Sequence, residues 1–179
     1  MLTKNFYNIL ASAGLFTSIK NKLKATDGTV YSYNTNMGAS SNSPLYFKNM
    51  NILMTSAPTS SGGVMVGTGK TPATADDYVL ESPVTSGITV NNQSATSYSL
   101  DDSGVHLSAT YGIRNTGSDP LEISEIGCFG YLTAIKTGNS TNVTASFLIE
   151  RTVLETPVVI PPNESRQITY TISLRYPTA

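Results

Sequence analysis

The stretch QITYTISLRY, residues 167–176, decides the fold class, because apolar and polar side chains alternate along it. A period of two is typical of a β-strand with one buried side and one side facing water. Residues 105–114 repeat the alternation, so the two segments together predict a half-buried antiparallel sheet whose outer face is rich in serine and threonine and nearly uncharged. The apolar series of the first stretch is Ile168, Tyr170, Ile172, Leu174 and Tyr176.

Short strand-like segments separated by turn residues fill the second half of the chain. Residues 115–120 contain Asn, Gly, Asp and Pro and predict a tight connection. Prolines within residues 156–162 predict an extended edge, because proline cannot donate to a sheet ladder. The apolar phase changes near residues 125–127, which predicts a bulge or a crossing between sheets. We therefore expect a mainly β protein, an antiparallel β-sandwich with jelly-roll or immunoglobulin-like connections.

The first 25 residues show a different periodicity. Apolar side chains recur at spacings of three and four from Phe6 to Leu23, which predicts an amphipathic helix. We interpret residues 1–25 as an N-terminal helical arm and residues 26–179 as the β-sandwich domain with a loop-rich first part. The arm could pack on its own sheet or dock on a neighbouring subunit. In the second case the interface residues would be Phe6, Ile9, Leu10, Phe16, Ile19, Lys20, Lys22 and Lys24.

Composition restricts the partners of the chain. Charged residues make up 13% of the 179 residues, against about 25% in ordinary soluble domains. The net charge of −1 argues against nucleic acid as the main partner, because phosphate binding requires clustered lysine and arginine. No apolar run approaches the roughly 18 residues of a membrane span, so no membrane partner is expected. Cys128 is the only cysteine, which excludes an internal disulfide.

Two motifs suggest a cofactor or a metal at first sight. Residues 67–71, GTGKT, resemble part of a phosphate-binding loop, but that loop requires glycine where Val64 stands. Asp76 and Asp77 form a carboxylate pair without the surrounding spacing of a calcium loop. We therefore expect neither a nucleotide nor a metal cofactor.

No candidate catalytic group has an activating neighbour in the sequence. His106 falls on the polar side of its predicted strand, and Cys128 is interpreted as a small core residue. Arg151 and Glu155 are expected to fix the turn into the proline-rich edge, a structural role. Core packing accounts for four tyrosines, Tyr98, Tyr111, Tyr170 and Tyr176. The sequence thus predicts a protein that is not an enzyme.

Three segments carry a resemblance to a known family: VMVGTGKTPATADDYVLESPV at 64–84, IRNTGSDPLEISEIGCFG at 113–130 and FLIERTVLETPVVIPPNESRQITYTISL at 147–174. They resemble a family of small virion structural proteins of tailed bacteriophages. The resemblance implies a protein without an enzymatic role, built into the particle as a head decoration, collar or tail component. Its partners would be major capsid, portal, neck or tail subunits and further copies of itself. It would reside in the virion after synthesis in the bacterial host cytoplasm.

A second class of function stays open at this point. The chain could be a receptor- or carbohydrate-binding β-sandwich module of a phage fibre or baseplate. Its ten tyrosines favour sugar stacking, whereas the lack of tryptophan does not.

Overall fold

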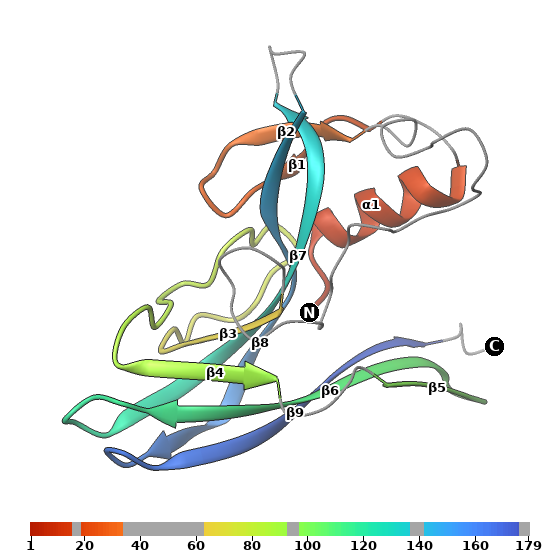
Figure 1. Ribbon diagram of the computed structural model, residues 1–179. Coiled ribbons are helices and arrows are strands. Elements are labelled where there is room, and N and C mark those ends of the chain that lie inside the picture. The colour runs from red at the N-terminus through yellow and green to blue at the C-terminus, as the bar shows by residue number, and fades with distance from the viewer. Residues whose placement is uncertain (16–18, 34–62, 93–96, 137–141, 176–179) are drawn as a thin grey trace.

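The computed structural model describes residues 1–15, 19–33, 63–92, 97–136 and 142–175, and for part of these, including residues 10–15 and 19–22, only the backbone. These residues form a mainly β structure with a short N-terminal helix, as predicted (Figure 1). The elements are α1 (Lys4–Leu15), β1 (Ile19–Lys24), β2 (Val30–Tyr33), β3 (Gly63–Gly67), β4 (Ile88–Asn92), β5 (Ser97–Asp101), β6 (Gly104–Asn115), β7 (Leu121–Lys136), β8 (Asn142–Ile160) and β9 (Ser165–Arg175).

The strands form two antiparallel sheets. In the first sheet the order is β1-β2-β7-β3, and β8 pairs with β7 along the other edge of that strand. In the second sheet β9 pairs with the whole length of β6. On the opposite edge of β6, β4 pairs with its second half and β5 with its first half, so β4 and β5 lie end to end.

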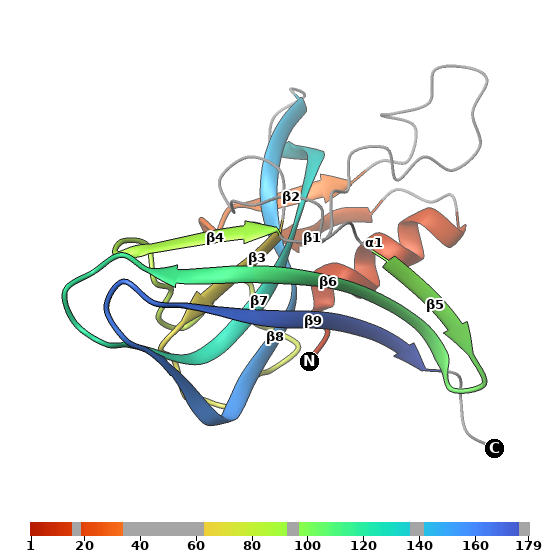
Figure 2. The same ribbon diagram turned by 60° about the horizontal axis from the view of Figure 1, so that its bottom comes forward.

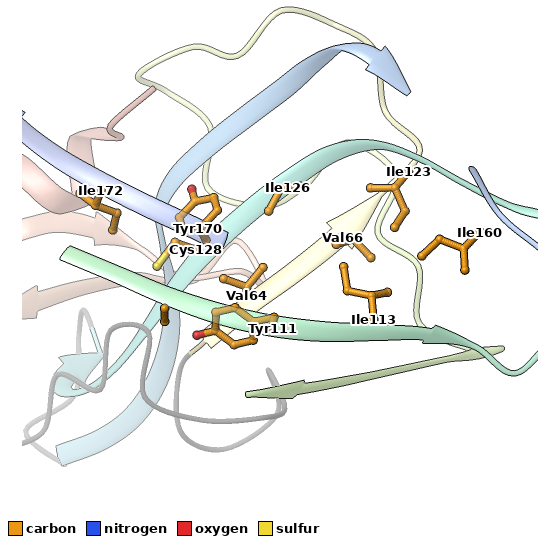
Figure 3. Close-up of a cluster of buried hydrophobic side chains, with 11 residues drawn as sticks. Val64, Val66, Tyr111, Ile113, Ile123, Ile126, Cys128, Ile160, Tyr170 and Ile172 are labelled. Atoms are coloured by element: carbon orange, nitrogen blue, oxygen red, sulfur yellow. The ribbon is translucent and has the colours of Figure 1, made fainter. Parts of the chain in front are cut away.

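The main core lies between the two sheets (Figure 3). The second sheet contributes the inward side chains that the alternation predicted, Tyr111 and Tyr170 among them, and the first sheet contributes Val64, Val66 and Cys128. Cys128 is buried, which confirms its interpretation as a small core residue. Each large apolar side chain withdrawn from water stabilises the fold by about 1.5 to 3 kcal/mol. The cluster comprises Val64, Val66, Ala109, Tyr111, Ile113, Ile123, Ile126, Cys128, Ile160, Tyr170 and Ile172.

Strand β8 is longer than the sequence predicted. We expected a separate extended edge at residues 156–162, but β8 begins at Asn142 and continues through this segment to Ile160. The register with β7 shifts where residues 154–157 lie opposite Ser124 alone. This irregularity accommodates Pro157, because proline is tolerated at bulges and at sheet edges. The shift stands just before Glu125, where the change of phase had predicted a bulge.

The N-terminal helix is shorter than predicted. It ends at Leu15, and Ile19 to Lys24 form β1, which pairs with β2 in a hairpin. The segment IKNKLK alternates apolar or polar residues with lysine, a period of two that competes with the helical spacing. Pairing with β2 satisfies backbone groups of this segment, and the turn at Asp27 and Gly28 makes the pairing possible.

The first turns of α1 belong to the chain's own core. Phe6 is 8% exposed and Ile9 is 2% exposed, and both pack in a second cluster with Leu23, Tyr31 and Phe147. The apolar surface of Phe6 and Ile9 is therefore covered within the chain, which agrees with an arm that packs on its own domain. The side chains of Leu10, Phe16, Ile19, Lys20 and Lys22 lie outside the described residues.

Polar contacts fix the same segment. Asn5 donates from Nδ2 to the Lys24 carbonyl oxygen (2.8 Å) and accepts from the Lys24 N–H (2.9 Å). The buried Thr3 hydroxyl donates to the Leu148 carbonyl oxygen at 2.6 Å. These bonds attach the helix start to β1 and β8, so residues 1–9 are integrated in the domain.

We expect Phe6→Ala to lower the free energy of unfolding by about 3 to 5 kcal/mol, because it leaves a cavity in the second cluster. Tyr7→Ala is the matched control, since Tyr7 is 53% exposed and contributes mainly an edge contact with the Phe6 ring. Its cost should be about 1 kcal/mol. Urea unfolding of both variants measures the difference. Equal, small losses would show that the helix does not belong to the core.

Candidate functional site

The outer face of the second sheet is polar, uncharged over most of its length and internally paired. Ser108 Oγ lies 2.8 Å from Thr171 Oγ1, and Thr110 Oγ1 lies 3.2 Å from Thr169 Oγ1. These pairs join β6 to β9 at directly opposed positions. The serine- and threonine-rich face that the sequence predicted is thus confirmed, and its hydroxyl groups bind each other across the strands.

His106 lies on this face at the turn between β5 and β6. Its Nδ1 lies 2.8 Å from Ser173 Oγ, and its Nε2 lies 3.1 Å from Ser103 Oγ. The side chain is half-buried, where full exposure had been expected. Hydrogen bonds from the Ser103 side chain and backbone, and one from His106, lower the pKa of Asp101 to about 2. The cluster contains a serine, a histidine and a carboxylate, but its contacts hold the β5–β6 turn against β9.

A shallow depression of about 320 Å³ lies farther along the same face. Gly112 has no side chain to fill the space between Asn91 on β4 and Gln167 on β9, which are its direct neighbours across the sheet. Arg114 also lines this space. The lining is mainly polar and consists of Thr89, Asn91, Gly112, Arg114, Ser165, Arg166 and Gln167. Such a set of donors suits a hydroxylated or anionic small ligand.

The GTGKT loop binds the chain's own carboxylates. The Gly69 N–H donates to Glu125 Oε1 at 3.2 Å, and the Thr71 N–H donates to Glu81 Oε2 at 2.8 Å. Lys70 Nζ lies 2.7 Å from Glu122 Oε1. A Cβ on Gly67 would overlap Glu125 Oε1, so this glycine is required by close approach. The amides that would hold phosphate in a nucleotide-binding loop therefore have internal acceptors here.

Arg151 is the centre of a buried ionic cluster. Its Nε donates to Glu125 Oε2 at 2.7 Å, its Nη1 to Asp77 Oδ2 at 2.8 Å and its Nη2 to Glu81 Oε2 at 3.3 Å. Arg151 and Glu125 are both buried. Burial raises the pKa of Asp77, but the bonds from Arg151 and Thr74 outweigh it, and the net pKa is lowered. These bonds attach the loop after β3 to β7 and β8.

The role of Arg151 is thus structural, although its partners differ from those expected. It binds the loop after β3, whereas we had placed it at the turn into the proline-rich edge. Glu155 is exposed. The two neighbouring aspartates also separate: Asp77 binds Arg151, and exposed Asp76 forms an ion pair with Lys4. Within the ranges that the structure describes, no group of three or more acidic, histidine or cysteine side chains is arranged to hold a metal ion.

Lys24 is the remaining interface candidate with a described side chain. Its Nζ lies 3.6 Å from the centroid of the Tyr78 ring, a cation–π contact within the chain. Hence the three interface candidates whose side chains are described, Phe6, Ile9 and Lys24, all have intramolecular partners. Among the described helices none is long and apolar enough to cross a membrane.

Strand β5 presents the exposed apolar surface that sequence reasoning missed. All five of its residues are exposed, and Tyr98 and Leu100 are 76% and 66% exposed. The expectation that Tyr98 packs in the core is wrong, whereas it is confirmed for Tyr111 and Tyr170; Tyr176 lies outside the described residues. Figure 2 shows the reason: β5 and the adjoining ends of β6 and β9 extend beyond the strands of the first sheet.

The inward face of β5 therefore has no covering layer in the described part of the chain. Tyr98 and Leu100 stand opposite Leu107 and Val105 of β6, which belong to the same face. We name the surface of these four residues the β5 ledge. Strand β5 also pairs with β6 alone among the described strands, so none of them occupies its second edge, which we call the open edge.

Comparisons of the chain with protein-family models, with curated proteins and with solved structures found no match. The candidate site therefore stands on its geometry.

We expect Arg151→Met to cost about 3 to 5 kcal/mol of unfolding free energy, because Glu125 would remain buried without its cation. Adding Glu125→Gln should restore part of that loss, since it removes the unpaired charge. Recovery would be incomplete, because the Glu125 carboxylate also accepts backbone N–H groups of Gly69, Glu81 and Ser82.

Urea unfolding of the single and double variants gives this coupling. Arg166→Met is the control, because the Arg166–Glu164 ion pair is exposed and such pairs contribute about 0 to 1 kcal/mol. A loss in Arg151→Met as small as in Arg166→Met would contradict the structural role of the cluster.

Proposed function

We propose that this chain is a non-enzymatic structural component of a tailed-bacteriophage virion, incorporated by subunit–subunit contacts as a head decoration, collar or tail accessory protein. The observation that carries the proposal is the open, apolar edge at β5. The resemblance of residues 64–84, 113–130 and 147–174 to small phage virion proteins supports it. The core shared by two antiparallel sheets supports, as the finer fold, a β-sandwich of jelly-roll or immunoglobulin-like type.

An unprotected strand edge is unusual in a protein that works alone. Natural edge strands are protected by proline, lysine, inward-pointing charges or a covering segment, because an open edge pairs with other chains. Strand β5 has the sequence SYSLD, with no proline or lysine, and its only charge is at the end. Its inward side chains are apolar and exposed. A surface with these properties fits an assembly contact made by strand addition.

The low charge of the chain fits the same role. With 13% charged residues, self-repulsion between copies is weak, and neighbours in a particle can pack closely. The proposed partners are major capsid, portal, neck or tail subunits together with further copies of this chain. The proposed location is the virion, after synthesis in the bacterial host cytoplasm. We propose β5 as the contact surface in place of the N-terminal arm, because Phe6 and Ile9 are buried within the chain.

The depression at Gly112 supports one alternative function, a carbohydrate- or receptor-binding module. Asn91 and Gln167 offer amide groups, and Arg114 offers a guanidinium group that can pair with a carboxylate. The lining contains no aromatic ring, so stacking on a neutral sugar has no platform there. An acidic sugar is therefore the ligand class that this depression would select.

We expect Leu100→Lys to abolish incorporation into particles, because a lysine on the β5 ledge must be desolvated in the contact. Val159→Lys is the matched control: Val159 is an apolar residue, 51% exposed, on a strand of the other sheet. Particles are purified on density gradients from cells that make each variant in place of the natural chain, and the chain is detected immunologically.

Normal incorporation of Leu100→Lys would refute β5 as the assembly surface. Absence of the natural chain from purified particles would refute the proposed function itself. Both variants should keep the circular dichroism spectrum of the natural chain, because the substituted side chains are exposed.

For the alternative function, we expect glucuronic acid to bind more tightly than glucose, since the two differ in the carboxylate that Arg114 would receive. Arg114→Gln should weaken glucuronic acid binding about tenfold or more, because a charge-assisted hydrogen bond is lost. Arg175→Gln, at the far end of β9, is the control. Titration followed by NMR chemical shifts measures both. Equal binding of the two sugars would exclude this function for the depression.

A further inference from the structure

We infer that β5 pairs with the β5 strand of a second copy of this chain, antiparallel and centred on Ser99, so that two second sheets join into one continuous sheet. This inference rests on the proposed function, because it names the first partner of the same assembly edge. It adds the identity of that partner, the strand direction and the register.

The backbone of β5 is oriented for this pairing. Strands β5 and β6 are joined by two residues, Asp102 and Ser103, and Asp101 pairs with Gly104. A two-residue hairpin closes on a hydrogen-bonded pair, and such pairs alternate with non-hydrogen-bonded pairs along the strands. The N–H and C=O groups of Ser97, Ser99 and Asp101 therefore point to β6. Those of Tyr98 and Leu100 point to the open edge.

The side chains of β5 are complementary to themselves under a two-fold rotation. In the sequence SYSLD, centring the antiparallel pair on Ser99 places Tyr98 opposite the partner's Leu100, and Leu100 opposite the partner's Tyr98. These are the two residues whose backbone groups are available, so each pair is hydrogen-bonded. Aromatic and aliphatic side chains directly opposite each other stabilise antiparallel strands. The two-fold axis thus gives two identical contacts between Tyr98 of one copy and Leu100 of the other.

The charges on β5 are compatible with the same register. Asp101 lies at one end of the strand and stands opposite the partner's Ser97, so the two aspartates are at opposite ends of the contact. Ser103 and His106 also bind the Asp101 carboxylate within its own chain. No like charges face each other in the paired strands.

The outer strand on the other side of β6 is less suited to the contact. Strand β9 bears Arg166 and Arg175, and its inward residues Tyr170 and Ile172 are already buried against the first sheet. On β5 the inward residues are the exposed ones. Pairing through β5 therefore brings exposed apolar side chains into contact and also satisfies backbone groups. Because it uses the same strand on both copies, the contact closes at a dimer.

Pairing also joins the two β5 ledges. Tyr98, Leu100, Val105 and Leu107 of each copy lie on the same side of the new sheet. The dimer then presents one apolar surface twice as large, with two-fold symmetry, towards the side where the first sheets lie.

Ser99→Cys in the full chain tests the register. At the two-fold axis Ser99 faces the partner's Ser99 in a non-hydrogen-bonded pair, where the Cα atoms are about 4.5 Å apart, a separation that allows a disulfide. Ser99 is exposed, and the natural Cys128 is buried. Mild oxidation with oxidised glutathione should therefore give a covalent dimer as the main product on a non-reducing gel.

Ser97→Cys is the matched control on the same strand. In the inferred register position 97 faces the partner's Asp101, and the two substituted side chains of a dimer would be about 13 Å apart along the strands, too far for a disulfide. Dimer from Ser99→Cys together with monomer from Ser97→Cys supports the inference. Equal cross-linking of both variants overturns the register.

If a cysteine variant does not fold, analytical sedimentation of the natural chain shows whether it is a dimer or a monomer. A dimer that Leu100→Lys converts to monomer supports the inference, and a monomer up to about 1 mM overturns it. If Ser99→Cys folds and does not cross-link while Leu100→Lys still blocks incorporation, another virion protein occupies β5. The self-pairing then fails and the proposed function stands. If Leu100→Lys also enters particles normally, both fail.

Discussion

The buried pair of Arg151 and Glu125 is the interaction on which the first sheet and the segments attached to it depend. A buried charge is costly unless it is paired, so the segments that supply the partners cannot move away without a large penalty. Asp77 and Glu81 attach the loop after β3 to Arg151, and the Arg151 N–H donates to the Met1 carbonyl oxygen at 3.0 Å. One arginine therefore holds β7, β8, this loop and the start of the chain together.

The two sheets differ in how they are covered, and this difference leaves one apolar surface exposed at the end of the second sheet. The N-terminal residues, α1 and the loop after β3 pack on the first sheet and are fixed there by buried polar contacts. The second sheet is held by the core on its inner face and by neutral hydroxyl pairs on its outer face. Its β5 end extends beyond the first sheet (Figure 2), which leaves Tyr98 and Leu100 exposed. The free surface thus results from the offset between the two sheets at this end.

Sequence reasoning succeeded where the signal was local. Strict alternation predicted β6, β9 and the identity of their buried faces. The prediction of a helix failed at Ile19 to Lys24. In this segment a four-residue spacing and a two-residue alternation coexist, and pairing with β2 stabilises the strand. Alternation also shows which side chains share a face of a sheet, but not whether another sheet covers that face. For this reason Tyr98 was predicted in the core, although it is exposed. The partners of Arg151 lie 26 to 74 positions away, a distance over which the sequence carries no local signal.

The β5 contact that we propose would have consequences for assembly. A contact made of backbone hydrogen bonds and apolar side chains fixes the direction and register of the partner, because a shift by one residue would turn Tyr98 and Leu100 to the other face. It also depends little on salt, since screening acts on charges and β5 bears only Asp101. A lysine-bearing arm would have given the opposite properties, loose geometry and strong salt dependence. The burial of Phe6 and Ile9 in the core therefore favours an assembly that is specified by shape and strand pairing over one guided by charge.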